Sequence, residues 1–304
     1  MQTTHHILMV RPAGFGYNVE AAQSNAFQHK PDENSDITQV ILDEFDGYVS
    51  ALRDKGVEVH VFEDTPYPVK PDAIFPNNWI TMHADGTITL YPMAVCNRRH
   101  EVRGDFVEKL KSDFRVEKVV DLTHLEAQNR FLEGTGSIIY DHANKTAYAC
   151  LSPRTDKHVF EELCASMSYK PVTFTSVDGN GKEIYHTNVM MHVGSKCAVV
   201  CLESIPNQDE RKLVETSLTE AGLDIVDITL DQVNQFAGNM LEVKSKSGEA
   251  ITVMSQSALD ALTEAQKELL AKSTTLLPVQ IPTIENIGGG SARCMMAEIF
   301  LPMK

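Results

Sequence analysis

The period of the apolar positions changes repeatedly along the chain. Residues 5–10 and 57–63 form short, mainly apolar runs of strand length. The segment 37–56 between them repeats apolar residues at helical spacing and ends on Gly56. This pattern predicts a strand, an amphipathic helix and a second strand.

The rest of the chain repeats one arrangement, in which a two-stranded hairpin is followed by a helix and a further strand. The hairpin turns carry residues that favour tight turns, such as Asp85-Gly86 and Ser247-Gly248. The predicted hairpins cover residues 79–93, 136–151, 189–205 and 239–255, and the predicted helices cover 98–114, 155–168, 207–222 and 257–273.

A polar or reactive residue marks the start of each hairpin at nearly constant spacing. Successive intervals are 55, 53, 53 and 55 residues, counted through Asn78, Glu133, His186, Asn239 and Cys294. Periods of this size are typical of solenoids, propellers and closed arrays. We therefore expect an α/β fold built as a five-unit ring, in which the N- and C-terminal segments share one unit. The alternative is a mixed α/β sheet with coincidental spacing.

The ring would bring the five loops to one end, around a single pore, because each marker residue precedes the first strand of its unit. Cys294, His186 and Glu133 are then a minimal set for nucleophilic catalysis, in which a thiolate attacks and an imidazole moves protons. The glycines at 288–290 would let backbone amides approach a developing charge. Taken alone, the glycine run followed by Cys294 also fits a mobile loop with an inert thiol after it.

Composition narrows the possible partners. The 304 residues are 42% hydrophobic and 23% charged, which is ordinary for a globular enzyme, and short linkers favour one domain over residues 1–304. A net charge of −15 argues against nucleic acid and anionic membranes as partners. We see no signal-peptide pattern, no apolar run long enough to span a membrane and no paired cysteine spacing, so we expect a cytoplasmic protein with reduced thiols.

Motifs for cofactors and metals do not occur in the sequence. The sequence contains neither GxGxxG, the dinucleotide-binding motif, nor GxxxxGK[ST], the P-loop motif. It also lacks the metal-ligand spacings HExxH and CxxC. We therefore expect no cofactor and no metal. The expected partner is a small-molecule substrate, and a homo-oligomer stays possible.

Five motifs resemble those of the guanidino-group-modifying enzymes with the α/β-propeller (pentein) fold, which include arginine deiminases, dimethylarginine dimethylaminohydrolases and glycine amidinotransferases. They are "PDAIFPNNW", "LEGTGS", "SPRTD", "HTN" and "GGGSARCM", spread over essentially the whole chain. The resemblance implies that Cys294 forms a covalent adduct with the substrate and that His186 is the acid/base. It also implies that Glu133 contacts the histidine and the substrate. It also implies that Arg154, and less directly Arg98, bind the substrate carboxylate.

Two positions depart from the family pattern. Members that bind a guanidinium cation present carboxylates to it, whereas this chain has Asn78 and Asn188. A carboxylate pairs well with a delocalised cation but would be left unpaired against a neutral urea. A carboxamide can both donate to and accept from a ureido group. The asparagines therefore favour a ureido substrate such as citrulline, with Asp72 as the remaining carboxylate.

The motifs "RPAGFGYN", "FPNNW" and "LEGTGS" also resemble the citrulline-utilisation hydrolases of this superfamily. That resemblance implies hydrolysis of citrulline to ornithine, CO2 and ammonia. Two alternatives stay open. One is a guanidine-directed hydrolase or transferase, in which Asp72 and Glu133 hold the cation; the other is a pentein-fold binding protein without activity. Asn18 and Asn25 are candidates for contacting the substrate amino group.

Overall fold

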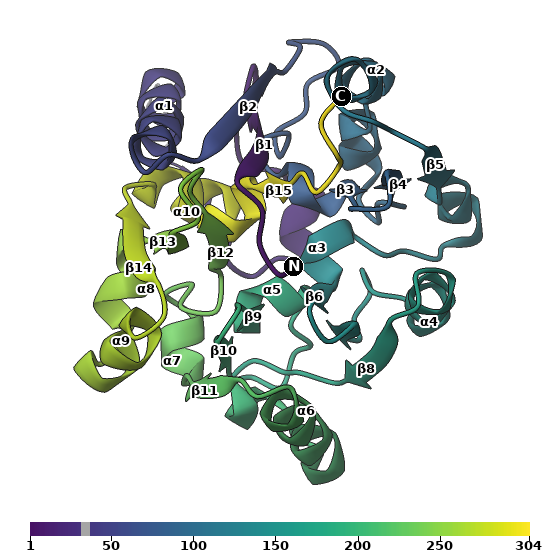
Figure 1. The fold of residues 1–304 in the computed structure, drawn as a ribbon. Helices are drawn as coiled ribbons and strands as arrows, with labels where there is room; N and C mark the ends of the chain where they lie inside the picture. The colour runs from purple at the N-terminus through teal and green to yellow at the C-terminus, as the bar shows by residue number, and fades with distance from the viewer. Residues whose placement is uncertain (32–36) are drawn as a thin grey trace.

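The structure, a computed structural model, describes residues 1–31 and 37–304. The strands of these residues form five three-stranded sheets arranged around a centre, and the longer helices lie outside them (Figure 1). This arrangement confirms the predicted five-unit α/β ring and rejects the single mixed sheet. That residues 1–304 form one domain stays a prediction.

Every sheet is built in the same way. Its first strand is antiparallel to the middle strand, and the third strand is parallel to the middle one. Four sheets are continuous in sequence: β3 (Ile80–Met82), β4 (Thr87–Leu90) and β5 (Lys118–Asp121); β6 (Ile139–Asp141), β7 (Thr146–Cys150) and β8 (Lys170–Phe174); β9 (Met191–Val193), β10 (Cys197–Val200) and β11 (Asp224–Asp227); β12 (Leu241–Lys244), β13 (Ala250–Ser255) and β14 (Thr275–Val279).

The fifth sheet joins the two ends of the chain. It consists of β15 (Ala297–Glu298), β1 (His6–Arg11) and β2 (Glu58–Glu63), in that order. β1 pairs antiparallel with β15, where Ile7 faces Glu298, and parallel with β2 over six residue pairs. The predicted sharing of one unit by the terminal segments is thus confirmed.

The outer helices follow the predicted crossovers, and each buries one face. In α1 (Thr38–Asp54) the buried residues recur at helical spacing, from Ile41 to Leu52, and pack against Ile7 and Met9 of β1. The other outer helices are α2 (Gly104–Asp113), α4 (Lys157–Ser166), α6 (Gln208–Glu220), α8 (Gln256–Ala261) and α9 (Glu264–Ala271).

Two predicted helices are interrupted. Residues 98–114 divide into the 3-10 helix η3 (Cys96–Glu101) and α2, because the two residues between them are extended. Residues 257–273 divide into α8 and α9, because Leu262 turns into the core in an extended conformation. Thr263 then caps α9 through a capping box with Gln266.

Short helical turns precede the first strands and gather at one end of the ring. These are η2 (Pro76–Asn78), α3 (Gly134–Ser137), α5 (Thr187–Met190) and η6 (Ala292–Met295), and η2 packs against both α3 and η6. The remaining short elements are η1 (Ala21–Gln23), η4 (Thr123–Gln128), η5 (Leu202–Ser204), α7 (Leu230–Val233) and α10 (Pro282–Gly288). The repeat markers therefore lie on loops that converge, as predicted.

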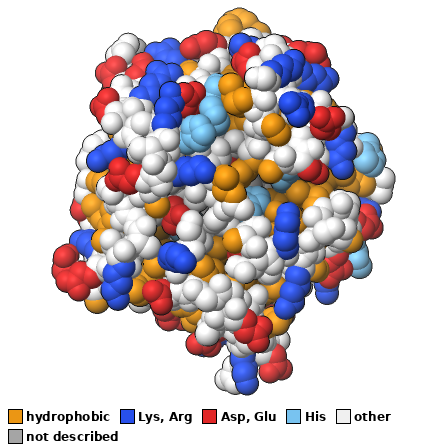
Figure 2. Space-filling view, viewed as in Figure 1, with side chains coloured by type: hydrophobic (Ala, Val, Ile, Leu, Met, Phe, Trp, Pro, Cys, Tyr) orange, Lys and Arg blue, Asp and Glu red, His pale blue; other side chains and the backbone are white. Residues whose placement is uncertain are grey.

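The surface carries mixed charge despite the acidic total. Figure 2 shows acidic and basic side chains interspersed over the face that carries both chain ends. In the described part of the chain, none of the helices has the length and apolar character needed to cross a membrane. All six cysteines are free thiols.

Candidate functional site

A small cavity lies among the converging loops. Its lining consists of Ala21, Asn25, Gln28, Asp72, Phe75, Asn78, Arg98, Arg154, Tyr185, His186, Gly288, Gly289, Gly290 and Cys294. The structure thus brings six of the eight predicted site residues into the lining of this cavity. The other two, Glu133 and Asn188, contact His186 and Cys294 directly. A larger hollow, lined by His5, His83 and Phe300 among others, contains none of the predicted site residues.

Cys294 lies in η6 with only 4% of its surface exposed. Its Sγ atom accepts hydrogen bonds from Asn188 Nδ2 and Asn239 Nδ2, each at 3.3 Å. Asn239 is itself fixed, because its Oδ1 accepts from the backbone N–H of Arg293 at 3.0 Å. Donors aimed at a sulfur stabilise its anionic form. The sequence showed Asn239 only as a repeat marker; its phase relative to Cys294 was the signal for this contact.

His186 and Glu133 form a buried hydrogen-bonded pair. His186 Nε2 lies 2.8 Å from Glu133 Oε2, and Glu133 Oε1 accepts from the N–H of Ala94 at 2.9 Å. Burial works to raise the pKa of Glu133, but the Arg154 charge and the His186 hydrogen bond outweigh it and hold that pKa well below its ordinary value. Glu133 is therefore ionised.

Burial lowers the pKa of His186 to about 4, although the hydrogen bond to Glu133 opposes the shift. The imidazole is consequently neutral at neutral pH. Because Glu133 is a carboxylate, Nε2 must carry the proton and donate it. Nδ1 is then the free basic nitrogen, available to accept a proton.

The loop motif "LEGTGS" allows this arrangement through Gly136. A Cβ atom at this position would lie 2.5 Å from Asn78 Nδ2 and 2.7 Å from His186 Nδ1. Contacts that short do not occur for real side chains, so the site requires glycine here. The same glycine brings His186 and Asn78, from different units of the ring, close together.

Arg154 lines the cavity, but its guanidinium is largely bound by protein. Its Nη2 donates to Ser24 Oγ at 2.6 Å and to the carbonyl of Ala21 at 3.1 Å, and its Nη1 lies 3.4 Å from Glu133 Oε2. The guanidinium also stacks over the Tyr185 ring at 4.9 Å. Its role in binding a substrate carboxylate stays a prediction.

Arg98 is held in a similar way. It makes two parallel hydrogen bonds to Glu101, at 2.9 and 2.8 Å, and donates to Asn78 Oδ1 at 2.7 Å. The pair Arg98–Glu101 is fully buried within η3. Glu101 was not singled out from the sequence, because a charged residue three positions after an arginine usually indicates an exposed helical face. Arg98 fixes the orientation of the Asn78 carboxamide.

Asp72 is buried beside the cavity. Its Oδ2 accepts from Asn18 Nδ2 at 2.8 Å and lies 3.7 Å from Arg98 Nε, whereas Oδ1 lies 3.5 Å from Gln28 Nε2. Burial raises the pKa of Asp72 above its ordinary value, against the effect of Arg98. Asn18 therefore binds Asp72, and Asn25 binds the carbonyl of Gly289, so their predicted contact with a substrate amino group stays a prediction.

The glycine loop is held by hydrogen bonds and is not a free turn. Gly289 has φ +59° and ends α10, and its N–H donates to the carbonyl of Glu285 at 2.9 Å. Its own carbonyl accepts from Asn25 and from the Tyr185 hydroxyl, at 3.0 and 2.8 Å. The carbonyl of Gly288 accepts from Gln28 Nε2 at 2.9 Å. The Gly289 amide is therefore engaged, and other donors must face any developing charge.

Three carboxamide atoms at the site are buried without a hydrogen-bond partner among the described residues. They are Asn78 Nδ2, Asn188 Oδ1 and Gln28 Oε1. An unpaired buried polar atom costs about 1–3 kcal/mol. These atoms offer one N–H group and two oxygens to a ligand, which is the hydrogen-bonding pattern complementary to an amide or urea.

Comparison with solved structures shows the same fold at low sequence identity. The N-terminal domain of ArgZ, an arginine dihydrolase from the ornithine-ammonia cycle in Cyanobacteria, gives a TM-score of 0.76 at 14% identity, covering 98% of both chains. Unliganded AgrE gives 0.76 at 15% identity over 98% of this chain and 40% of AgrE. A Pseudomonas aeruginosa DDAH mutant complexed with citrulline gives 0.68 at 13% identity, covering 98% of this chain and 100% of that chain.

Comparison of the sequence with known families gives one match that covers nearly the whole chain. The family described as "N,N dimethylarginine dimethylhydrolase, eukaryotic" matches residues 11–301. No curated protein matched the chain. The match agrees with the cavity at the centre of a five-unit ring and with the solved structures of the same fold. The chain therefore belongs to the N,N-dimethylarginine dimethylhydrolase family, within the guanidino-group-modifying enzymes of the pentein fold.

Proposed function

We propose that the protein hydrolyses citrulline to ornithine, CO2 and ammonia through a covalent adduct on Cys294. The observation that carries this proposal is the pair of unpartnered carboxamide atoms at the site, Asn78 Nδ2 and Asn188 Oδ1. Asn78 lines the cavity with Cys294, and the Asn188 carboxamide contacts the thiol. A ureido group has one oxygen to accept from the former and N–H groups to donate to the latter. Both contacts form without burying an unpaired charge.

The carboxylates of the site support a neutral head group. A guanidinium cation binds best to carboxylate oxygens that are free for two parallel hydrogen bonds. Glu133 is already paired with His186 and Arg154. Glu101 is paired with Arg98, and Asp72 has a single oxygen without a strong partner. A ureido group needs no counter-ion, so this set fits it better.

The neutral His186 supports the first chemical step. Its Nδ1 takes the Cys294 proton, and the sulfur attacks the ureido carbon while Asn78 Nδ2 donates to the developing oxyanion. The imidazolium then protonates the substrate nitrogen, the C–N bond breaks and ornithine leaves. A carbamoyl group stays bonded to sulfur. His186 next takes a proton from water, which attacks the carbamoyl carbon and releases carbamic acid, and this decomposes to CO2 and ammonia.

A guanidine-directed reaction is the second candidate. The family match and the arginine dihydrolase among the solved relatives favour it, as does Asp72 Oδ1, which faces only Gln28 at 3.5 Å. In this case Asp72 would bind the guanidinium cation of the substrate, which would be arginine or a methylated arginine.

The test is an assay of the purified protein with citrulline, arginine and dimethylarginine, in which ornithine, citrulline and ammonia are measured. We expect ornithine and ammonia in equal amounts from citrulline, and no release from the Cys294→Ser variant. Turnover of arginine or dimethylarginine without turnover of citrulline would contradict the ureido proposal and support the second candidate. A Cys96→Ser variant, which removes an exposed thiol outside the cavity, serves as the control.

The preference for a neutral head group is tested separately by the variant Asn188→Asp. The added carboxylate would lie beside Cys294 and favour a cation over a neutral head group. We expect kcat/KM for citrulline to fall at least tenfold and the ratio of arginine to citrulline turnover to rise. If that ratio is unchanged, the discrimination does not reside in the Asn188 carboxamide.

A further inference from the structure

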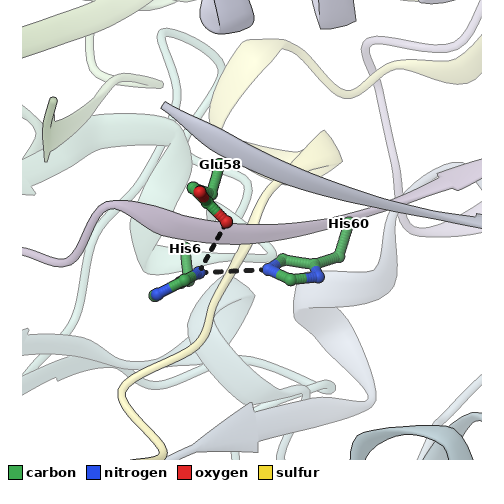
Figure 3. A group of neighbouring side chains, drawn as sticks. All are labelled: His6, Glu58 and His60. Carbon is green, nitrogen blue, oxygen red and sulfur yellow. Dashed lines mark hydrogen bonds and ion pairs between the residues drawn. The ribbon is translucent and has the colours of Figure 1, made fainter. Parts of the chain in front are cut away.

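A cluster of two histidines and a glutamate lies on the sheet that joins the chain ends. In the parallel pairing of β1 with β2, His6 faces Glu58 and Leu8 faces His60. Alternate residues of a strand lie on the same face. All three side chains therefore lie on one face of these two strands and point toward one another (Figure 3).

The donor atoms of the cluster are close enough to share one ion. His6 Nδ1 lies 3.1 Å from His60 Nε2 and 3.7 Å from Glu58 Oε2, and the three ligand atoms all lie within 4.8 Å of one another. Two ligands bound tetrahedrally to one zinc ion, each about 2.1 Å from it, are roughly 3.4 Å apart. Within residues 1–31 and 37–304, no other group of three histidine, cysteine or acidic side chains meets this spacing.

The contacts of Glu58 also suit metal binding. Lys246 pairs with Oε1 of Glu58, which leaves Oε2 facing the histidines.

We propose that His6, Glu58 and His60 form a binding site for a divalent cation of the zinc class. Two imidazoles and one carboxylate are ligands that Zn²⁺ accepts, and the partly exposed edge leaves the fourth position to water. The ion would replace the His6–His60 hydrogen bond, with the proton of the donor ring moved to its outer nitrogen, so that both rings carry their N–H there. The site would fasten the first strand of the ring to the second.

This site is separate from the cavity at Cys294. His6 begins β1, whereas Cys294 precedes β15, which runs antiparallel to β1. The two therefore lie at opposite ends of the same sheet. None of the cluster residues lines the small cavity. The cation site consequently does not depend on the proposed reaction.

The experiment titrates chelator-treated full-length protein with Co²⁺ and then Zn²⁺. We expect one Co²⁺ per chain with the visible absorption of a nitrogen and oxygen site, displaced by Zn²⁺, and a rise in Tm on adding Zn²⁺. The variants His60→Asn and Glu58→Gln should each weaken binding at least tenfold and lose the Tm rise. Circular dichroism shows whether each variant is folded. If one of the two variants does not fold, the other still tests the site.

The matched control is His158→Asn, which removes an exposed histidine from α4 and should bind as the unmodified protein does. Equal binding by the His60 and His158 variants would overturn the proposal. So would an absorption band of thiolate bound to Co²⁺, since it would place the ion on a cysteine. Absence of stoichiometric binding would mean that the cluster is a hydrogen-bonded pair with a surface ion pair only.

Discussion

Cys294 lies between two carboxamides that come from different units of the ring. Asn188 precedes β9 and Asn239 precedes β12, and both donate to the same sulfur at 3.3 Å. The thiol is thus held by side chains 106 and 55 residues away in sequence. Its environment depends on closure of the ring as much as on its own loop.

Asn239→Asp tests this environment. The carboxylate can still accept from the Arg293 N–H, but it has no N–H to donate and places negative charge beside the sulfur. We expect alkylation of Cys294 by iodoacetamide at pH 7 to slow at least tenfold, since a hydrogen bond to a charged group contributes about 1.5–3 kcal/mol. Mass spectrometry of the peptides measures the rate, and the exposed Cys96 is the internal reference. An unchanged ratio of the two rates would contradict the role given to Asn239.

At this scale the sequence predicts which residue types meet, but not their hydrogen bonds. The shared phase of Glu133, His186 and Cys294 was sufficient to bring them to one place. The pairing of Arg98 with Glu101 was not foreseen, because it depends on η3 turning both side chains into the core. The hydrogen-bond partners of Asp72, Asn18 and Gln28, also come from the N-terminal segment, which lies outside the repeat.

Among the elements, α3 shows how a four-residue turn can determine a site. Its Gly136 lies directly against the side chains of His186 and Asn78. The repeat predicted where this turn would lie. The close approach of two other loops to it could be seen only in three dimensions.

Gly136→Ala should therefore impair activity more than stability. The new methyl group would displace Asn78 Nδ2 and His186 Nδ1, which lie 2.5 and 2.7 Å from its position. We expect a loss of about 1–3 kcal/mol in unfolding free energy from overpacking. We also expect kcat/KM to fall about a hundredfold, because the reacting groups move.

The control for this prediction is Gly47→Ala in α1. No heavy atom lies within 4 Å of a Cβ there, so the change should leave activity intact and stabilise the helix by about 0.5–1 kcal/mol. Urea unfolding and steady-state kinetics on both variants make the comparison. Equal activities of the two variants would show that α3 does not position the site.

Helix ends were the least predictable feature at the scale of elements. Apolar spacing alone extended two helices through residues 98–103 and 262–263, where the chain is 3-10 or extended. Buried side chains lie in both places, Arg98 in the 3-10 segment and Leu262 in the extended one. Burial of this kind depends on neighbouring units, so periodicity within one segment does not contain it.

For the whole molecule, the buried histidines predict acid lability. Burial lowers the pKa of His83 and His186 to about 4, and that of His142 and His192 to about 3. Unfolding returns them to about 6.5, so the stabilisation is present above pH 6.5 and is lost as pH falls toward 4. Glu101, whose pKa burial raises to about 7, binds one proton in the folded state and offsets one histidine.

With about three more protons bound by the unfolded chain, the free energy of unfolding should fall by roughly 4 kcal/mol per pH unit near pH 5. Thermal unfolding from pH 7 to pH 5 measures this slope. His192→Gln should reduce this slope by the contribution of about one proton. The exposed His158→Asn should leave the slope unchanged. A Tm that stays constant over this range would show that the buried histidines do not control stability.

The pairing of β1 with β15 joins residues about 290 positions apart, and η6 with Cys294 lies immediately before that junction. Contacts so distant in sequence close late, after local hairpins and helices have formed. A refolding chain would accordingly recover its circular dichroism before its thiol acquires the partners Asn188 and Asn239. The return of catalytic activity during refolding would then report ring closure. Its time course would give the rate of the last folding step.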